Sequence, residues 1–401
     1  MPFLPYGRQH IDDDDIAAVV SVLRSDWLTT GPVVDTFEMA FAEKVGAKYA
    51  VACNSGTAGL HIAMMALGLG PGDVAIVPTM TFLATANAAR YVGAEVEFAD
   101  VNAETGLMDE ESLRSAILRS GGRAKAILPV HLNGQCVDMP MIAQIAAEYG
   151  MAVVEDACHA LGTSYKSNGV NIQVGSCQHS DIAVYSLHPV KTITMGEGGM
   201  VTTNDPEMYE RMSRFRTHGM VRASEAFKNE TLAFGSNGEP NPWYYEMPEP
   251  GYNYRASEIN CALGLSQLAK LDFFIERRQE LAALYDGALT SLAPLIKPVP
   301  RVPETSAALH LYVVHIDFAA LGMERGSFMR KLTEMGIGTQ VHYLPVHLQP
   351  YYQERYGQSS FTGAQSYYDR CLSLPLFPTM ENTDVERVVS ALSGILNETD
   401  A

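Results

Sequence analysis

The feature that most constrains this chain is a repeated order of short apolar runs, polar loops and helical periodicity. Residues 49–73 begin with the apolar run YAVAC, pass through the small-residue turn NSGT into a helical pattern, and end at GLGPGD. The same order recurs in the segments VAIVPTMTFLATANAARYVG, AKAILPVHLNGQ, IAQIAAEYGMAVVEDACHALG and DIAVYSLHP. This alternation predicts an α/β fold with a mainly parallel sheet covered by helices.

Chain length and local pattern predict two domains. Because 401 residues exceed what one compact core usually holds, we expect a large domain over 1–265 and a smaller α/β domain over 266–401. The large domain should include a helix from about Asp13 to Arg24, where acidic residues precede an apolar-periodic segment. Periodicity is lost over 221–250, which predicts a long loop.

Composition excludes several classes of partner and site. With 46 acidic against 28 basic residues, a net charge of -18 and no basic run, the chain is not expected to bind nucleic acid. No apolar run is long enough to span a membrane and the first residues do not resemble a secretory signal, so we expect a cytoplasmic protein. Neither a metal site nor a disulfide framework is expected, because the cysteines are dispersed: Cys53, Cys136, Cys158, Cys177, Cys261 and Cys371.

Lys191 follows the apolar run of DIAVYSLHP and precedes a glycine-rich turn. Burial of an ammonium group without a partner is costly and lowers its pKa, so the neutral amine becomes available. A neutral lysine is what Schiff-base formation with a carbonyl needs. A lysine at the end of a single strand is more commonly a surface residue, and this alternative stays open on Lys191 alone.

Three other strand ends match an aldehyde cofactor that carries a phosphate and a pyridine ring. Gly56 and Thr57 lie at a strand-to-helix junction, where backbone N–H groups favour an anion. Asp156 ends a strand and is suited to a protonated pyridine nitrogen, and Phe82 follows a strand and is suited to stacking. Each has a structural alternative: a helix cap, a solvated acid and a core aromatic residue. Ligands in such sheets bind at this edge.

Several segments resemble one family. NSGTAGLHIA, VVEDACHALG, YSLHPVKTITMGEGGM and GYNYRASEINCALGLSQL together resemble the DegT/DnrJ/EryC1/StrS sugar aminotransferases, and the likeness extends over almost the whole chain. Its most specific element is the series Ser186, His188, Lys191 and Gly196 to Gly199. The resemblance implies a fold-type I transferase, like aspartate aminotransferase, that depends on pyridoxal 5'-phosphate (PLP).

The resemblance also implies residue roles. Lys191 would bind PLP as a Schiff base and carry protons, Asp156 would hold the pyridine nitrogen, and Phe82 would stack on the ring. His159 would lie near the phenolic oxygen of the cofactor. The phosphate would be bound by Gly56, Thr57 and Ser186, and by Asn253 of a second subunit, which implies a homodimer with two shared sites.

Within the family, four further segments carry a more specific resemblance: IDDDDIAAVVSVLRSDWLTTGPVVDTFE, LPVHLNGQCVDM, VHYLPVHLQPYY and LSLPLF. They most resemble enzymes of pseudaminic acid biosynthesis, which implies transfer of an amino group from glutamate to C4 of a UDP-linked 4-keto-6-deoxy-N-acetylhexosamine. The residues expected to contact the sugar nucleotide are Thr30, Gly31, His188, Tyr312, His342 and Tyr343. Core packing is the alternative for the two tyrosines, and His188 is also compatible with a packing role.

Two other functions remain open at this stage. One is amination of another nucleotide-linked keto sugar, with a dTDP or GDP carrier and the keto group at C3 or C4. The other belongs to a different class: a nucleotide-sugar binding or regulatory protein that uses no cofactor. Sugar dehydratases of the family carry histidine in place of the lysine, so Lys191 argues against that activity.

Overall fold

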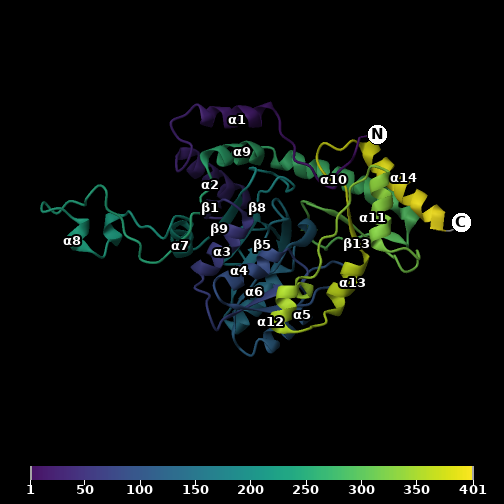
Figure 1. The fold of residues 1–401 in the computed structure, drawn as a ribbon, viewed down its shortest axis with the longest axis horizontal. Helices are drawn as coiled ribbons and strands as arrows, with labels where there is room; N and C mark the ends of the chain where they lie inside the picture. Colours follow the sequence, from purple (N-terminus) through teal and green to yellow (C-terminus); the bar gives the residue numbers. More distant parts are fainter. Residues whose placement is uncertain (1, 400–401) are drawn as a thin grey trace.

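The computed structural model describes residues 2–399 and is built around one seven-stranded sheet (Figure 1). The strand order is β1-β9-β8-β5-β4-β2-β3. From β3 to β8 all neighbours run parallel, and only β9 runs antiparallel to both β1 and β8. The predicted α/β fold with a mainly parallel sheet is confirmed. The strands are β1 (Tyr49–Cys53), β2 (Val74–Pro78), β3 (Glu95–Ala99), β4 (Ala124–Ile127), β5 (Ala152–Asp156), β8 (Ile182–Ser186) and β9 (Gly199–Thr203).

Helices pack on both sides of this sheet (Figure 1). The predicted first helix is confirmed as α1 (Asp13–Leu23), which Asp12 caps and which packs on α9 (Glu258–Leu268). The other helices around the sheet are α2 (Pro32–Val45), α3 (Gly56–Ala66), α4 (Leu83–Tyr91), α5 (Glu110–Arg119), α6 (Met139–Tyr149) and α7 (Pro206–Arg216), with the short η1 (Leu132–Gly134) after β4.

The C-terminal part has its own hydrophobic cluster, which Leu4 of the N-terminal segment joins by pairing with Ile337. The boundary near residue 265 stays a prediction. The elements of this part are α10 (Leu271–Ala288), η3 (Leu289–Leu292), β10 (Ile296–Pro298), β11 (Thr305–Ser306), β12 (Tyr312–Ile316), α11 (Arg325–Glu334), η4 (Val346–Leu348), α12 (Pro350–Tyr356), α13 (Thr362–Arg370), β13 (Cys371–Leu374) and α14 (Asn382–Thr399). β10, β12 and β13 form one small sheet, while β11 joins the hairpin of β6 (Ser164–Ser167) and β7 (Val170–Gln173).

The segment 221–250 projects from the body beyond α7 as an arm (Figure 1). Within it only η2 (Ser224–Ala226) and α8 (Glu230–Ala233) are regular, in agreement with the predicted long loop. Four of its large apolar side chains are exposed, namely Leu232, Trp243, Tyr245 and Met247, and Trp243 is 73% accessible. The exposed apolar side chains of the arm are therefore not covered by the rest of the chain.

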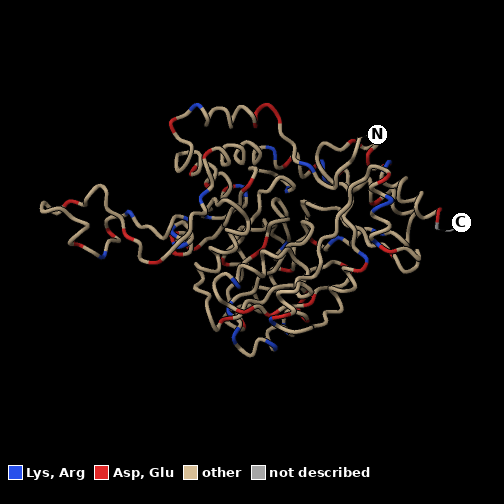
Figure 2. The backbone as a smooth tube through the Cα atoms, viewed as in Figure 1, with Lys and Arg blue, Asp and Glu red and all other residues tan. Residues whose placement is uncertain are grey.

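The parallel arrangement gathers several loops at one edge of the sheet, because the carboxyl ends of parallel strands face the same way. β5 ends at Asp156 and β8 ends at Ser186, while β2 leads through Phe82 into α4. Acidic and basic residues are interspersed along the chain, with no continuous basic stretch (Figure 2). Within residues 2–399 no helix is both long and apolar enough to cross a membrane.

Candidate active site

A cavity of about 500 Å³ lies at this sheet edge, where loops of the large sheet meet a segment of the C-terminal part. Most of the residues predicted for the site line it: Gly56, Thr57, Phe82, Asp156, His159, Ser186, His188, Lys191, His342 and Tyr343. Except for Asn253, the structure therefore brings the proposed cofactor residues together with three of the proposed sugar contacts, His188, His342 and Tyr343. Their chemical roles stay predictions.

Lys191 lies in the turn after β8, where its backbone N–H donates to the carbonyl of His188 at 2.9 Å. Burial lowers the pKa of the Lys191 amine below its ordinary value, although the neighbouring Cys158 and Asp156 act in the opposite direction. The glycine-rich turn that follows lets β9 approach α3 closely, since a Cβ at Gly199 would lie 2.5 Å from the carbonyl oxygen of Ser55. The turn thus brings the lysine and the start of α3 to one cavity.

Asp156 is buried at the end of β5 and both of its carboxylate oxygens accept hydrogen bonds. The hydroxyl of Thr85 donates to Oδ2 at 2.6 Å, and the backbone N–H of Cys158 donates to Oδ1 at 3.2 Å. Thr81 lies 2.8 Å from Thr85, oxygen to oxygen. The orientation of the carboxylate is therefore determined by protein groups, as the holder of a cofactor ring requires. Sequence reasoning missed Thr85, whose contact spans 71 positions.

The start of α3 offers an anion site. Ser55 caps the helix by accepting from the N–H of Ala58 at 3.1 Å, while the N–H groups of Gly56 and Thr57 precede any acceptor within the helix. A Cβ at Gly56 would lie 3.0 Å from the Cβ of Ser186, so glycine allows the hydroxyl-bearing Ser186 to approach the helix start. These groups fit the phosphate of PLP.

Histidines and a tyrosine cover another side of the cavity. His159 Nε2 lies 3.0 Å from the hydroxyl of Tyr343, and His342 Nδ1 lies 2.8 Å from the hydroxyl of Ser373. Burial lowers the pKa of His159 well below its ordinary value and that of His342 to about 3. His310 and Tyr6 also line the cavity, and sequence reasoning missed both because neither follows a strand end or a motif.

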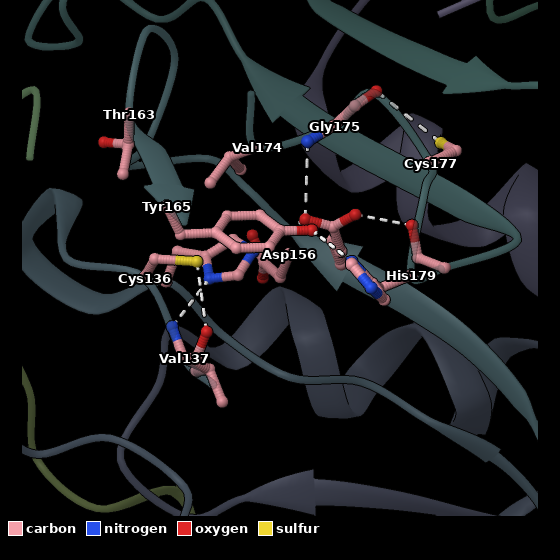
Figure 3. Close-up of polar contacts among 12 residues, drawn as sticks. Cys136, Val137, Asp156, Thr163, Tyr165, Val174, Gly175, Cys177 and His179 are labelled. Carbon is pink, nitrogen blue, oxygen red and sulfur yellow. Dashed lines mark hydrogen bonds and ion pairs between the residues drawn. The ribbon is translucent and has the colours of Figure 1, made fainter. Parts of the chain in front are cut away.

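Buried polar contacts link β5 to the loops around it (Figure 3). The carboxylate of Glu155 accepts from Nε2 of His131 at 2.9 Å and from the N–H of Gly175 at 3.3 Å. Nearby, the hydroxyl of Tyr165 lies 2.8 Å from Nδ1 of His179. Since Glu155 directly precedes Asp156, this network holds the strand that presents the catalytic candidate.

Four predicted residues lie outside the cavity. Thr30 and Gly31 line a separate hollow of about 420 Å³. Asn253 is exposed and pairs with Thr217 through the backbone, so its predicted role requires a second subunit. The prediction for Tyr312 is wrong: its ring is buried in the C-terminal core and its hydroxyl donates to Asp286 at 2.6 Å. Tyr312 is therefore a core residue, the alternative stated for it in the sequence analysis.

Comparison with known proteins agrees with this geometry. A model of the DegT/DnrJ/EryC1/StrS aminotransferase family matches residues 9–393. Over 401 aligned residues the chain is 40% identical to the spore coat polysaccharide biosynthesis protein SpsC of Bacillus subtilis (strain 168), covering 99% of this chain and 98% of SpsC.

Solved structures show the same fold. PseC of Helicobacter pylori, an aminotransferase involved in the biosynthesis of pseudoaminic acid, superposes with a TM-score of 0.88 at 28% identity and covers 99% of this chain and 100% of its own. Spr1654 of Streptococcus pneumoniae in its PLP form reaches 0.87 at 27% identity, with 99% of each chain covered. The predicted fold class and cofactor are confirmed. The chain belongs to the DegT/DnrJ/EryC1/StrS aminotransferase family, whose members include PLP-dependent sugar aminotransferases, and it is one of these enzymes.

Proposed function

We propose that the protein moves an amino group from glutamate to C4 of a UDP-linked 4-keto-6-deoxy-N-acetylhexosamine. This is the reaction of UDP-4-amino-4,6-dideoxy-N-acetyl-β-L-altrosamine transaminase in pseudaminic acid biosynthesis. The observation that most supports amino transfer is the convergence of Lys191, Asp156 and the start of α3 on one cavity. The likeness to PseC along the whole chain supports the choice of sugar.

Lys191 would do the proton transfer. Bound PLP supplies an aldehyde carbon and an electron-withdrawing ring. The amine of Lys191, whose pKa burial lowers, would hold the aldehyde carbon until the amino donor arrives. It would then take a proton from Cα of glutamate and, in the second half of the cycle, deliver one to C4 of the sugar.

Asp156 and the start of α3 would orient the cofactor. The Asp156 carboxylate, held by Thr85 and the N–H of Cys158, would accept a hydrogen bond from the ring nitrogen. The N–H groups of Gly56 and Thr57 and the hydroxyl of Ser186 would bind the phosphate. These contacts leave the lysine free to move between the two reacting carbons.

The same proposal includes a homodimer and a nucleotide-linked substrate. Among the described residues that line the cavity, Lys191 is the only lysine or arginine. A diphosphate and the carboxylates of glutamate need further donors. In the proposed homodimer, Asn253 of a second subunit would donate to the phosphate of the cofactor.

Borohydride trapping tests the role of Lys191. After incubation with PLP and reduction, peptide mapping should find the modified side chain at Lys191, and Lys191→Ala should lose both the yellow colour and amino transfer. The matched control is Lys166→Ala, since Lys166 is exposed on β6. Fixation of the cofactor at another lysine would contradict the assignment.

A substrate panel tests the choice of sugar. UDP- and dTDP-linked 3-keto and 4-keto sugars are each incubated with glutamate, and 2-oxoglutarate and the amino sugar are quantified. We expect the highest kcat/KM with the UDP-linked 4-keto sugar and amination at C4 by NMR. Turnover confined to dTDP-linked or 3-keto sugars would reject the proposed substrate while retaining the aminotransferase.

A further inference from the structure

The backbone determines which nitrogen of His159 carries the proton. The N–H of Asn133 donates to Nδ1 of His159, with 3.3 Å between the two nitrogens. Asn133 is buried and adopts a left-handed conformation with φ +62°, which turns its N–H toward the ring. A nitrogen that accepts a hydrogen bond has no proton of its own, so a neutral His159 carries its proton on Nε2.

This tautomer determines the direction of the next hydrogen bond. His159 Nε2 lies 3.0 Å from the Tyr343 hydroxyl, so the histidine donates and the tyrosine accepts. Burial lowers the pKa of His159 and raises the pKa of Tyr343, so that both groups stay neutral near pH 7. The opposite direction would require a proton on Nδ1, which would then point at the N–H of Asn133.

The hydroxyl hydrogen of Tyr343 therefore remains free for another acceptor. Within residues 2–399, His159 is the only hydrogen-bond partner of this hydroxyl, and Tyr343 lines the cavity with Lys191. The rings of Phe82 and His159 lie 5.8 and 5.9 Å from the Tyr343 ring, centroid to centroid, and restrict its position. A hydrogen donor is thus held at the wall of the cavity.

We infer that His159 acts on bound ligands through Tyr343: the chain Asn133 N–H, His159, Tyr343 ends in a hydroxyl that donates to a ligand oxygen beside Lys191. Tyr343 is the contacting residue, and Asn133 and His159 are positioning residues. This inference deepens the proposed aminotransferase function and rests on it for the identity of the ligand. The oxygen belongs either to the cofactor ring or to a substrate carbonyl or carboxylate.

The tautomer is measured first, on protein without cofactor. In ¹⁵N-histidine NMR at pH 7, the signals that disappear in His159→Gln are assigned to His159. They should show a protonated Nε2 and an unprotonated Nδ1. A protonated Nδ1, whether in the other tautomer or in the imidazolium, would overturn the inference, and this result does not depend on which sugar is the substrate.

Substitution of Tyr343 measures what its hydroxyl contributes to ligand binding. Tyr343→Phe should weaken either PLP binding or substrate binding by about 10- to 100-fold, the usual effect of losing a hydrogen bond to a charged or buried partner. A rise in the apparent PLP dissociation constant assigns the oxygen to the cofactor. An unchanged PLP constant with a raised KM for glutamate or for the keto sugar assigns it to that substrate.

Two further variants separate this role from a structural one. His159→Gln should stay within about threefold of the natural protein, because a glutamine side chain can accept from Asn133 and donate to Tyr343, whereas His159→Leu should behave like Tyr343→Phe. Tyr367→Phe is the matched control, since the Tyr367 hydroxyl is buried and contacts the side chain of Asn133 at 2.8 Å but lies outside the cavity. If Tyr343→Phe changes neither constant, or if Tyr367→Phe changes them equally, the inference fails. If the natural protein does not bind PLP at all, the proposed function itself is rejected.

Discussion

At the scale of single residues, this site combines titratable groups whose pKa burial lowers with a carboxylate that neighbouring groups hold in place. Burial lowers the pKa of Lys191, His159 and His342. Hydrogen bonds from Thr85 and a backbone N–H to both oxygens of Asp156 hold its carboxylate in one orientation. A base and a fixed acid can therefore lie in one small cavity without forming a direct ion pair.

The hydroxyl of Thr85 should matter for cofactor binding. Thr85→Val keeps the shape of the side chain but removes the donor to Asp156, which costs about 1–3 kcal/mol and should raise the PLP dissociation constant about 10- to 100-fold. Thr85→Ser retains a hydroxyl and should bind PLP almost normally. Absorbance titration of the two proteins compares them directly, and equal affinities would show that Thr85 does not position Asp156.

His315 should make the fold sensitive to acid. Burial, then the charge of Arg370, lowers its pKa to about 4, while Glu104 acts in the opposite direction and Lys297 adds to the lowering. Because the unfolded chain takes up this proton near pH 6.5 and the folded chain only near 4, folding stability falls as pH decreases through this window. The contribution of this group between pH 7 and 4.5 is about 2 kcal/mol.

Substitution tests this contribution. Both ring nitrogens of His315 lack a hydrogen-bond partner among the described residues, so His315→Leu removes the titration without breaking a hydrogen bond. Urea unfolding at pH 7 and 4.5 should give a smaller stability difference for this variant than for the natural protein. The same pH dependence in both proteins would assign the acid sensitivity to other groups.

At the scale of elements, a distant carboxylate holds the start of α2. Glu258, at the start of α9, accepts from the N–H groups of Gly31, Val33 and Val34 at 2.9, 3.0 and 3.2 Å. These donors have no acceptor inside α2, and the positive end of the helix dipole favours a negative charge there. One side chain thus joins α2, α9 and the loop that contains Thr30.

Removal of this charge should destabilise the junction. Glu258→Gln turns an amide toward N–H donors and removes the favourable charge, so the free energy of unfolding should fall by about 1–3 kcal/mol. The control is Glu276→Gln, since Glu276 is exposed on the adjacent α10. Urea midpoints measure both variants, and equal midpoints would contradict a capping role for Glu258.

At the scale of the whole molecule, the side that carries the arm exposes apolar side chains that the rest of the chain does not cover. The arm 221–250 projects from the body with Trp243 and Met247 exposed. Asn253 follows the arm and lies outside the cavity that Lys191 lines. These features agree with the proposed homodimer, in which each subunit completes the site of the other.

Complementation between subunits tests that arrangement. Lys191→Ala and Asn253→Ala should each have low activity, but in a random mixture of the two chains half of the dimers contain one intact site, so about a quarter of the natural activity should return. The control pair is Lys191→Ala with Asp156→Ala, which share one subunit's cavity and should not complement. If the first pair recovers no more than the control, Asn253 does not act across the interface.

Local sequence patterns and the family resemblance were sufficient for the class of fold and for most of the residues that line the cavity. Each apolar run with a polar end became a strand, and the loops of the parallel strands meet at one edge because the strands run in the same direction. Asp156 and Lys191 were therefore proposed from local patterns and Ser186 from the family resemblance, and all three line the cavity. No local sequence pattern predicted the order of the strands in the sheet or the antiparallel direction of β9.

What the sequence by itself determined is the class of fold, the cofactor and the strand-end residues, since these follow from short segments. Only the tertiary structure decided the partners: Thr85 meets Asp156 across 71 positions, and His159 meets Tyr343 across 184. It also excluded Tyr312, because burial depends on what the rest of the chain packs around a residue rather than on its neighbours in sequence. Polar contacts are short in range, and only folding brings such distant groups within reach.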